Sequence, residues 1–241
     1  MRTPPPPGDP NVLTREFPTL TWPAQQPLSR VHRVEHDTAY FATGQDGRFN
    51  PPLPEAGFGT LYLSSHPRGA FVETLGRFRY ISQAMINERV LAEVYMPSDL
   101  RLADLTNPQV LGKFGISNDL SMGNEDDAYA LAQQWALRLW QAGFSGLYYG
   151  ARRDVELQSR SVALFGKPGD EGESAVLSTL HPLSEIAAEM ADHYGFVIVT
   201  GLPLQEPVQL GVPVTGQSGT GCARPRRVTM SCWSGKRRFW R

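Results

Sequence analysis

The spacing of apolar residues along the chain predicts short strands and helices in an irregular order. Runs rich in β-branched or apolar residues indicate strands over residues 29–34, 60–63, 89–96, 146–149, 161–165 and 196–199. Helical spacing of apolar residues predicts helices over residues 70–79, 125–142 and 183–194. In the second of these, Ala128, Leu131, Trp135 and Leu139 recur at intervals of three and four. This order predicts an α+β fold and gives no support to a regular βαβ nucleotide-binding fold.

Both ends of the chain differ in composition from the segment between them. Residues 1–26 contain seven prolines and no sustained periodicity, so we expect an irregular, Pro-rich leader. From residue 201 onward Pro, Gly, Val and Ser dominate without a period, and a basic end follows. We therefore assign residues 27–200 to the folded domain and expect residues 201–241 to form a disordered tail.

Composition and charge narrow the class of protein. Hydrophobic residues make up 41% and charged residues 20% of the 241 positions, which excludes global disorder. Seven of the 23 basic residues follow Glu206, where no acidic residue occurs, so residues 1–206 hold 16 basic and 24 acidic groups and a net charge of -8. An acidic domain argues against direct nucleic-acid binding by the domain itself.

Cysteine usage and hydropathy indicate the compartment. Both cysteines, Cys222 and Cys232, lie in the basic tail, so no disulfide framework is expected in the domain. No apolar run approaches the roughly 20 residues that a membrane span needs, and the Pro-rich start lacks the apolar stretch of a signal peptide. We expect a cytoplasmic protein that does not enter a membrane.

One candidate metal motif lies near the start of the domain. His32 and His36 enclose the pattern H-x-x-E-H with Glu35, which on a helix places two histidines on one face as zinc ligands. Val31 and Val34 favour a strand here, in which the two rings do not share that geometry. A zinc hydrolase remains an alternative, but the sequence offers no clear third ligand and we expect no metal site.

A second set of polar residues surrounds a Gly- and Pro-rich loop and the first predicted helix. Arg48 lies in a glycine-flanked turn, Tyr62 in a predicted strand, and Glu73 in an apolar helical turn. An arginine can hold a diphosphate through paired hydrogen bonds, and a carboxylate can stabilise the cationic centre that forms when an N-glycosidic bond breaks. A tyrosine can stack on a ring and donate a hydrogen bond at its tip. Spacing alone does not distinguish this function from ordinary structural roles.

Residues 28–166 resemble the RES domain, a family named for its Arg, Glu and Ser residues whose members include toxins of bacterial toxin–antitoxin pairs. The resemblance is carried by residues 30–32 (RVH), 47–51 (GRFNP), 59–64 (GTLYLS), 70–73 (AFVE), 146–149 (GLYY) and 162–165 (VALF). It implies a fold similar to that of ADP-ribosyltransferases, with split small β-sheets and surrounding helices. It also implies hydrolysis or phosphorolysis of the nicotinamide–ribose bond of NAD+, with NAD+ as substrate, inorganic phosphate as a second possible acceptor and no other cofactor.

The resemblance also assigns roles to individual residues. Glu73, Arg48 and Tyr62 match the catalytic Glu, Arg and Tyr of the family. The implied substrate-binding residues are Arg30, Asn50, Tyr149, Ala151 and Arg152. In this scheme Arg30 and Arg48 hold the diphosphate, Tyr62 packs beside the nicotinamide, and Glu73 stabilises the ribosyl cation and directs the acceptor. An Xre-type antitoxin is the implied protein partner.

One position departs from the family pattern. RES domains commonly have a serine in a Tyr-x-Ser-Arg sequence after the late strand, whereas this chain has Ala151 between Gly150 and Arg152. The missing hydroxyl leaves a non-catalytic RES-like module that binds a nucleotide as an alternative to an NAD+-degrading toxin. Since the sequence does not identify the acceptor, an ADP-ribosyltransferase that modifies a macromolecule is a further alternative.

Overall fold

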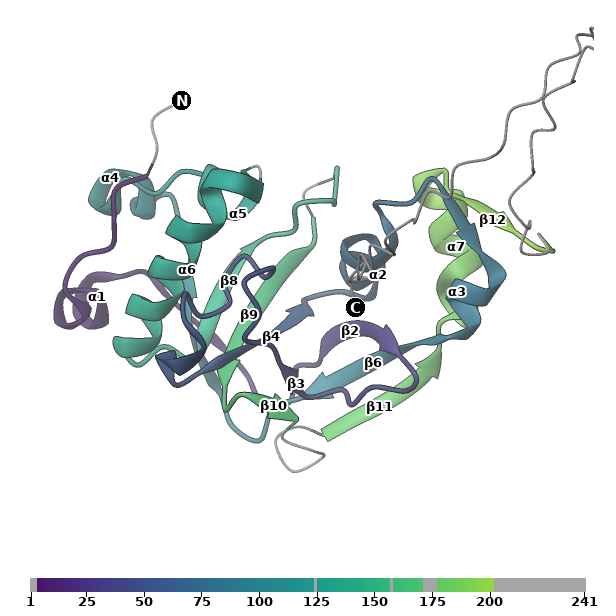
Figure 1. Ribbon diagram of the computed structural model, residues 1–241, viewed down its shortest axis with the longest axis horizontal. Coiled ribbons are helices and arrows are strands. Elements are labelled where there is room, and N and C mark those ends of the chain that lie inside the picture. The colour runs from purple at the N-terminus through teal and green to yellow at the C-terminus, as the bar shows by residue number, and fades with distance from the viewer. Residues whose placement is uncertain (1–3, 124, 157, 171–176, 202–241) are drawn as a thin grey trace, which may run out of the picture. The chain divides into compact units, whose positions relative to one another are not determined.

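An eight-stranded mixed sheet organises the chain, as the computed structural model shows (Figure 1). The structure describes residues 4–123, 125–156, 158–170 and 177–201. These belong to one unit, Met1–Leu202, and the expected tail lies outside the described residues apart from Gly201.

The elements follow one another in the irregular order expected from the sequence. The helices are α1 (Pro10–Glu16), α2 (Pro67–Leu75), α3 (Gln83–Asn87), α4 (Gln109–Phe114), α5 (Asp119–Met122), α6 (Glu125–Gln141) and α7 (Ser184–Tyr194), with a 3-10 turn at Pro54–Ala56. The strands are β1 (Thr19–Trp22), β2 (Leu28–Arg33), β3 (Tyr40–Phe41), β4 (Gly59–Ser64), β5 (Tyr80–Ser82), β6 (Arg89–Tyr95), β7 (Leu100–Asp104), β8 (Gly146–Gly150), β9 (Arg160–Gly166), β10 (Gly169–Asp170), β11 (Leu177–Pro182) and β12 (Val197–Val199).

The large sheet has the order β1-β7-β8-β9-β4-β2-β6-β11, and β10-β3 and β12-β5 form two small ladders. Within the large sheet β7 and β8 run parallel and the other neighbours are antiparallel. β4 and β2 are joined by a single register pair, Ser29 with Ser64. The α+β expectation is therefore confirmed, whereas the expected split small sheets form one continuous sheet with a narrow joint between β4 and β2.

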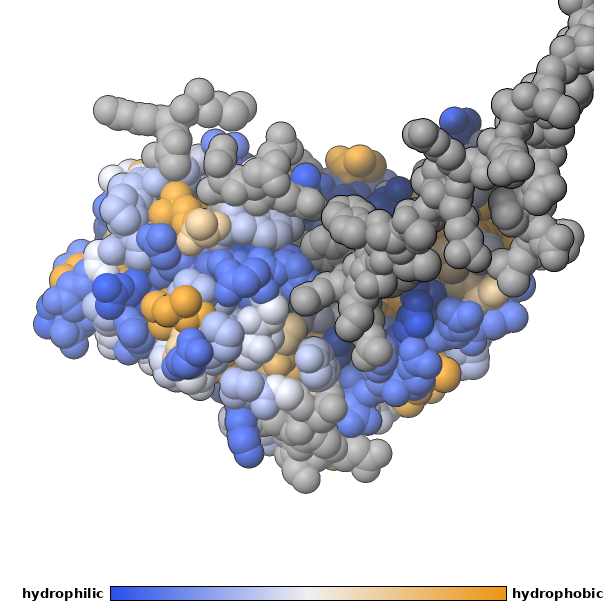
Figure 2. Space-filling view, in the orientation of Figure 1, coloured by the Kyte–Doolittle hydropathy of each residue, from blue (hydrophilic) through white to orange (hydrophobic). Residues whose placement is uncertain are grey.

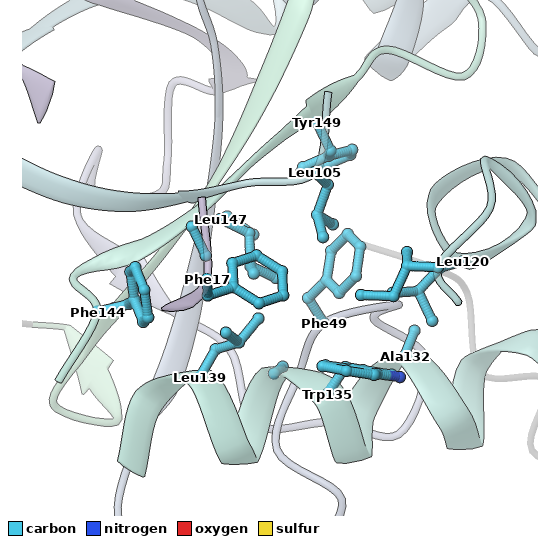
Figure 3. Packing of buried hydrophobic residues seen from close by; sticks show 14 of the residues in the cluster. Phe17, Phe49, Leu105, Leu120, Ala132, Trp135, Leu139, Phe144, Leu147 and Tyr149 are labelled. Carbon is cyan, nitrogen blue, oxygen red and sulfur yellow. The ribbon is translucent and has the colours of Figure 1, made fainter. Parts of the chain in front are cut away.

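Three apolar clusters stabilise the two faces of the sheet. Side chains alternate between faces along each strand, so the register assigns each cluster to a face. On one face α6 packs over β8 and β9 around Trp135, Phe49 and Leu147, the cluster drawn in Figure 3. On the same face, beyond β4, α2 and α7 pack over β2 and β6 around Phe71. The third cluster, which includes Leu61 and Val162, covers the opposite face.

The expected irregular leader is the main difference from the sequence analysis. Pro10–Glu16 forms a helix whose N-cap, Asp9, accepts a hydrogen bond from the N–H of Asn11 at 2.7 Å. Thr19–Trp22 forms the edge strand paired with β7. Leu13 and Phe17 are buried in the cluster under α6. The expectation of irregular structure is wrong for these residues because a few apolar side chains anchor a proline-rich segment.

We expect Leu13→Ala to lower the free energy of unfolding by about 2–3 kcal/mol. Leu13 is 1% exposed, and truncating a buried leucine removes its transfer energy and leaves a cavity. The neighbouring Val12 is 37% exposed, so Val12→Ala is the matched control and should change stability by less than about 0.5 kcal/mol. Equal effects of the two substitutions in urea unfolding would contradict the docked leader.

Exposed apolar side chains are scattered over the visible face of the described surface. In Figure 2 the exposed apolar residues of the visible face lie in separate patches among hydrophilic ones. None of the helices in the described part of the chain combines the length and apolar character that crossing a membrane requires.

Candidate functional site

A row of polar side chains crosses the middle of the sheet between the two apolar clusters of one face. The register places Tyr149 of β8 opposite Ser161 of β9, Ser161 opposite Ser64 of β4, and Ser64 opposite Ser29 of β2. Residues directly opposite in antiparallel strands point to the same face. All three serines are buried, so this row marks a polar zone within an otherwise apolar face.

The loop before β4 is fixed to this zone by hydrogen bonds from Tyr62. The Tyr62 hydroxyl accepts the N–H of Phe49 at 2.9 Å and donates to Oδ1 of Asn50 at 3.0 Å. The Asn50 side chain donates in turn to the Gly44 carbonyl at 2.7 Å. Gln133 of α6 donates to the carbonyls of Gln45 and Gly47 at 3.0 Å each. Both ends of the buried Asn50 side chain are thereby used to hold the loop.

This loop carries Arg48, whose guanidinium is buried. It donates to the carbonyl of Leu120 at 3.2 Å and to that of Gly123 at 2.7 Å, and it lies 4.6 Å from the ring centroid of Tyr129. Burial lowers the pKa of Arg48, yet an arginine remains charged near neutral pH. No carboxylate among the described side chains forms an ion pair with it.

Tyr149 connects this charge with the carboxylate of α2. Burial raises the pKa of Tyr149 well above its usual value, and the nearby Tyr62 and Glu73 raise it further. A hydrogen bond with the Ser161 hydroxyl and the charge of Arg48 act in the opposite direction on that pKa. Electrostatic coupling therefore links Tyr149 to Arg48, Tyr62 and Glu73, three residues that come from a loop, a strand and a helix.

Glu73 is half-buried on α2 and is held by the segment that follows β8. Its Oε1 accepts the backbone N–H of Arg153 at 2.8 Å, and its Oε2 lies 3.7 Å from Nη1 of the same residue. The Arg153 guanidinium also donates to the Glu73 carbonyl at 3.4 Å. The carboxylate is thus oriented by one residue while its oxygens keep lone pairs for a further contact.

Two expected binding residues precede Arg153. Ala151 is buried and donates its N–H to the Ser159 carbonyl at 3.4 Å, where the family pattern has a serine. Arg152 lies close enough to Arg48 to lower the pKa of that guanidinium by charge repulsion, after the larger effect of burial. The structure therefore brings Arg152 to the same group as Arg48, Tyr62, Glu73 and Tyr149.

Arg30 lies on the other face of the sheet. It is paired with Ala92 on β6, and it shares its face with Leu28, while Ser29 and Val31 point to the face of Tyr62. Its guanidinium donates to the carbonyl of Thr38. In these contacts Arg30 supports the turn after β2, apart from the group around Arg48.

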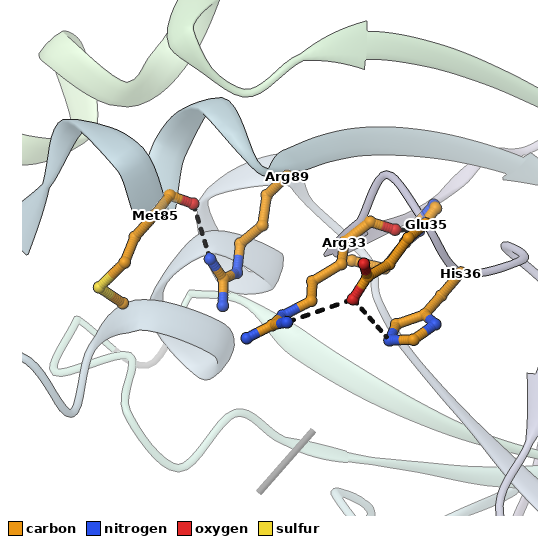
Figure 4. A network of polar contacts seen from close by, with 6 residues as sticks. Arg33, Glu35, His36, Met85 and Arg89 are labelled. Atoms are coloured by element: carbon orange, nitrogen blue, oxygen red, sulfur yellow. Dashed lines mark hydrogen bonds and ion pairs between the residues drawn. The ribbon is translucent and has the colours of Figure 1, made fainter. Parts of the chain in front are cut away.

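The two histidines of the candidate metal motif are engaged separately. His32 lies in β2, where its Nδ1 donates to the Arg33 carbonyl at 2.9 Å and its Nε2 accepts the Thr38 hydroxyl at 3.1 Å. His36 follows the strand, and its ring faces Glu35 at 3.7 Å beside Arg33 (Figure 4). Both ring nitrogens of His32 are occupied. No group of three or more potential ligands is close enough for a metal among the residues that the structure describes.

We expect His32 to make stability depend on pH. Burial is the main cause that lowers the pKa of His32 from 6.5, so below about pH 6.5 the unfolded chain takes up a proton that the folded state resists. Stability should fall as the pH drops through this range, by at most about 1.4 kcal/mol per pH unit. His32→Gln should reduce this slope in urea unfolding between pH 7 and 5. An unchanged slope would contradict the assignment.

Several residues of this site were missed in the sequence analysis. Ser161 lies opposite Tyr149 because β8 pairs with β9 in this register. Tyr129 lies beside Arg48 because α6 packs against the loop that carries Arg48. Arg153 lies next to Arg152 but carries no family signal. Spacing in the sequence contains no information about these contacts because each one joins elements far apart in the chain.

Comparisons with known proteins bear on the family and on the fold. A family model described as the RES domain matches residues 27–183. A comparison with curated protein sequences gives no match. Among solved structures, the chain is similar to a chain in the crystal structure of the M. tuberculosis MbcT–MbcA toxin–antitoxin complex, with 21% sequence identity, a TM-score of 0.50 and coverage of 72% of this chain and 92% of that chain. This similarity supports the α+β fold, and since the family match spans well over half of the sequence, the chain belongs to the RES domain family.

Proposed function

We propose that this chain is a RES-type toxin that cleaves the nicotinamide–ribose bond of NAD+. The observation that carries the proposal is the convergence of Arg48, Tyr62, Glu73 and Tyr149 from four separate elements onto one polar zone. A buried cation and an oriented carboxylate, both near the phenol of Tyr149, suit a substrate that combines a diphosphate with a glycosidic bond to a cationic ring.

In the proposed reaction Arg48 and Arg152 hold the diphosphate. The C1′–N bond breaks, nicotinamide leaves with the bonding electron pair, and positive charge develops on the ribose. The Glu73 carboxylate stabilises this charge and orients the acceptor. When water attacks C1′ it releases one proton to solvent, and the products are nicotinamide and ADP-ribose. Phosphate in place of water would give ADP-ribose 1″-phosphate.

The toxin assignment adds a partner. The structurally similar chain belongs to a toxin–antitoxin complex, and family membership makes the same kind of pairing the simplest expectation for this chain. We propose that an Xre-type antitoxin protein neutralises it by blocking access to Glu73 and Arg48.

The test is induced expression in a bacterial host with measurement of growth and cellular NAD+. The proposal predicts growth arrest and NAD+ loss with wild-type protein, and neither with Glu73→Gln. Purified protein assayed with and without phosphate then identifies the acceptor. Radiolabel from NAD+ retained on protein or RNA would instead select an ADP-ribosyltransferase.

A non-catalytic nucleotide-binding module is the second candidate, and the buried Ala151 favours it. The hydroxyl that the family commonly has at this place is missing. NAD+ binding without turnover would select this candidate, and Ala151→Ser should then restore turnover. If the wild type is active, Ala151→Ser should raise kcat by about tenfold, because one hydrogen bond gained in the transition state is worth about 1.4 kcal/mol.

A further inference from the structure

We propose that Asp154 and Arg153 are positioning residues, which together fix the Glu73 carboxylate in its reactive orientation. This inference rests on the proposed function, since it assigns roles around the carboxylate that the function requires. Neither residue belongs to the Arg, Glu and Ser pattern of the family. Asp154 lies two residues beyond Arg152, in the segment between β8 and β9.

Asp154 closes the turn between β8 and β9 from inside. Its side chain is 1% exposed, and its two oxygens accept the N–H of Ser159 at 2.6 Å and the N–H of Glu156 at 3.1 Å. Burial alone would raise the pKa of Asp154, but hydrogen bonds from Ser159, Glu156 and Gln158 more than offset it and hold that pKa below its usual value. A buried carboxylate with several N–H donors fixes the backbone around it.

The fixed turn presents the backbone N–H of Arg153 to Glu73. The N–H to Oε1 distance of 2.8 Å is that of a charge-assisted hydrogen bond. The guanidinium lies 3.7 Å from Oε2 and reaches the Glu73 carbonyl, so Arg153 contacts both the side chain and the backbone of its partner. Because a backbone donor does not depend on a rotamer, its aim is set by the turn and hence by Asp154.

Helix α2 packs closely against the same turn, so neither element can shift far relative to the other. A Cβ at Gly69 would collide with Oγ of Ser64 and lie 2.7 Å from Cβ of Ser159. On its outer side the turn is tied to α7 by Glu156, 3.1 Å from the His193 ring. With α2 and the turn both fixed, a change at Asp154 is transmitted to the Glu73 carboxylate rather than absorbed. Misplacing a catalytic group by about 1 Å can reduce turnover roughly 100-fold.

The test compares Asp154→Asn with Val155→Ala in the purified full chain. The asparagine side chain has one acceptor oxygen, so its NH2 group faces one of the two N–H donors, that of Ser159 or of Glu156. Val155 is 84% exposed in the same turn, so Val155→Ala should leave kcat unchanged. We expect Asp154→Asn to lower kcat for nicotinamide release by about 10- to 100-fold with little change in the KM for NAD+. In a Glu73→Gln background it should have no further effect on kcat, since both changes act through one group.

A second variant and a spectroscopic readout keep the result decisive if Asp154→Asn fails to fold. Arg153→Ala should lower kcat by several fold and Arg153→Lys should restore part of the loss. The amide proton of Arg153 should resonate downfield in the wild type and move upfield in Glu73→Gln. Two results would overturn the positioning role. One is a double variant whose loss of kcat is the product of the losses from Asp154→Asn and Glu73→Gln. The other is an Arg153 amide chemical shift that does not change in Glu73→Gln. A wild type that releases no nicotinamide would instead refute the proposed function, and the amide shift would still decide the contact.

Discussion

Glu73→Gln is expected to reduce nicotinamide release by about 100- to 1,000-fold while NAD+ still binds. Glutamine keeps an oxygen that can accept the N–H of Arg153, which Glu73 accepts at 2.8 Å, so the local fold should persist. The substitution removes the negative charge that stabilises the positive charge on the ribose. Loss of such stabilisation typically costs about 100- to 1,000-fold in kcat. The measurement is kcat from nicotinamide release, together with NAD+ affinity by calorimetry.

The matched control is Glu93→Gln, since Glu93 has a similarly half-exposed carboxylate on β6, 3.8 Å from His181. It should leave nicotinamide release unchanged. The role of Glu73 would be refuted by a Glu73→Gln protein that has the same Tm as the wild type and retains more than about a tenth of the wild-type turnover.

Arg48→Met is expected to raise the KM for NAD+ by about 100-fold or more and to destabilise the fold. Methionine fills much of the same volume but leaves the carbonyls of Leu120 and Gly123 without their donor. Hydrogen bonds to a charged group contribute roughly 1.5–3 kcal/mol each, and Arg48→Met removes two of them, so we expect a loss of about 3–6 kcal/mol of stability. The readouts are steady-state kinetics and urea unfolding.

Two controls separate charge from geometry at this position. Arg138→Met removes a guanidinium whose described bond is to Gln141 on the outer side of α6, and it should affect neither quantity. Arg48→Lys keeps a charge but not the planar fork that reaches two carbonyls, so it should fall between wild type and Arg48→Met. An unchanged KM in Arg48→Met would contradict diphosphate binding by this residue.

Much of the fold was predictable because its strong local signals agree with the final structure. The strand expected at residues 29–34 is β2, and the helix expected at residues 125–142 is α6. The sequence did not predict elements whose burial or pairing depends on segments far away in the chain. In α1 proline content masks the buried Leu13, and in β11 the side chains are largely exposed and show no alternation.

Three of the candidate residues were expected from the resemblance to the family, but their arrangement was not. The sequence pattern pointed to Arg48, Tyr62 and Glu73, which the structure places in one electrostatic group. It did not indicate that Arg30 points to the other face, because the face to which each β2 side chain points depends on how β2 pairs with β6. Nor did it indicate Arg153 or Asp154, whose relation to Glu73 exists only once the turn after β8 meets α2.

The most direct test of the account is nicotinamide release from NAD+ by the purified full chain, measured beside Glu73→Gln protein prepared in parallel. The account predicts turnover by the wild type, in the presence of water or phosphate as acceptor, and its loss in the variant with the fold intact. NAD+ that stays whole with the wild type, or turnover that survives in Glu73→Gln, would contradict the central claim that this RES domain destroys NAD+ through Glu73.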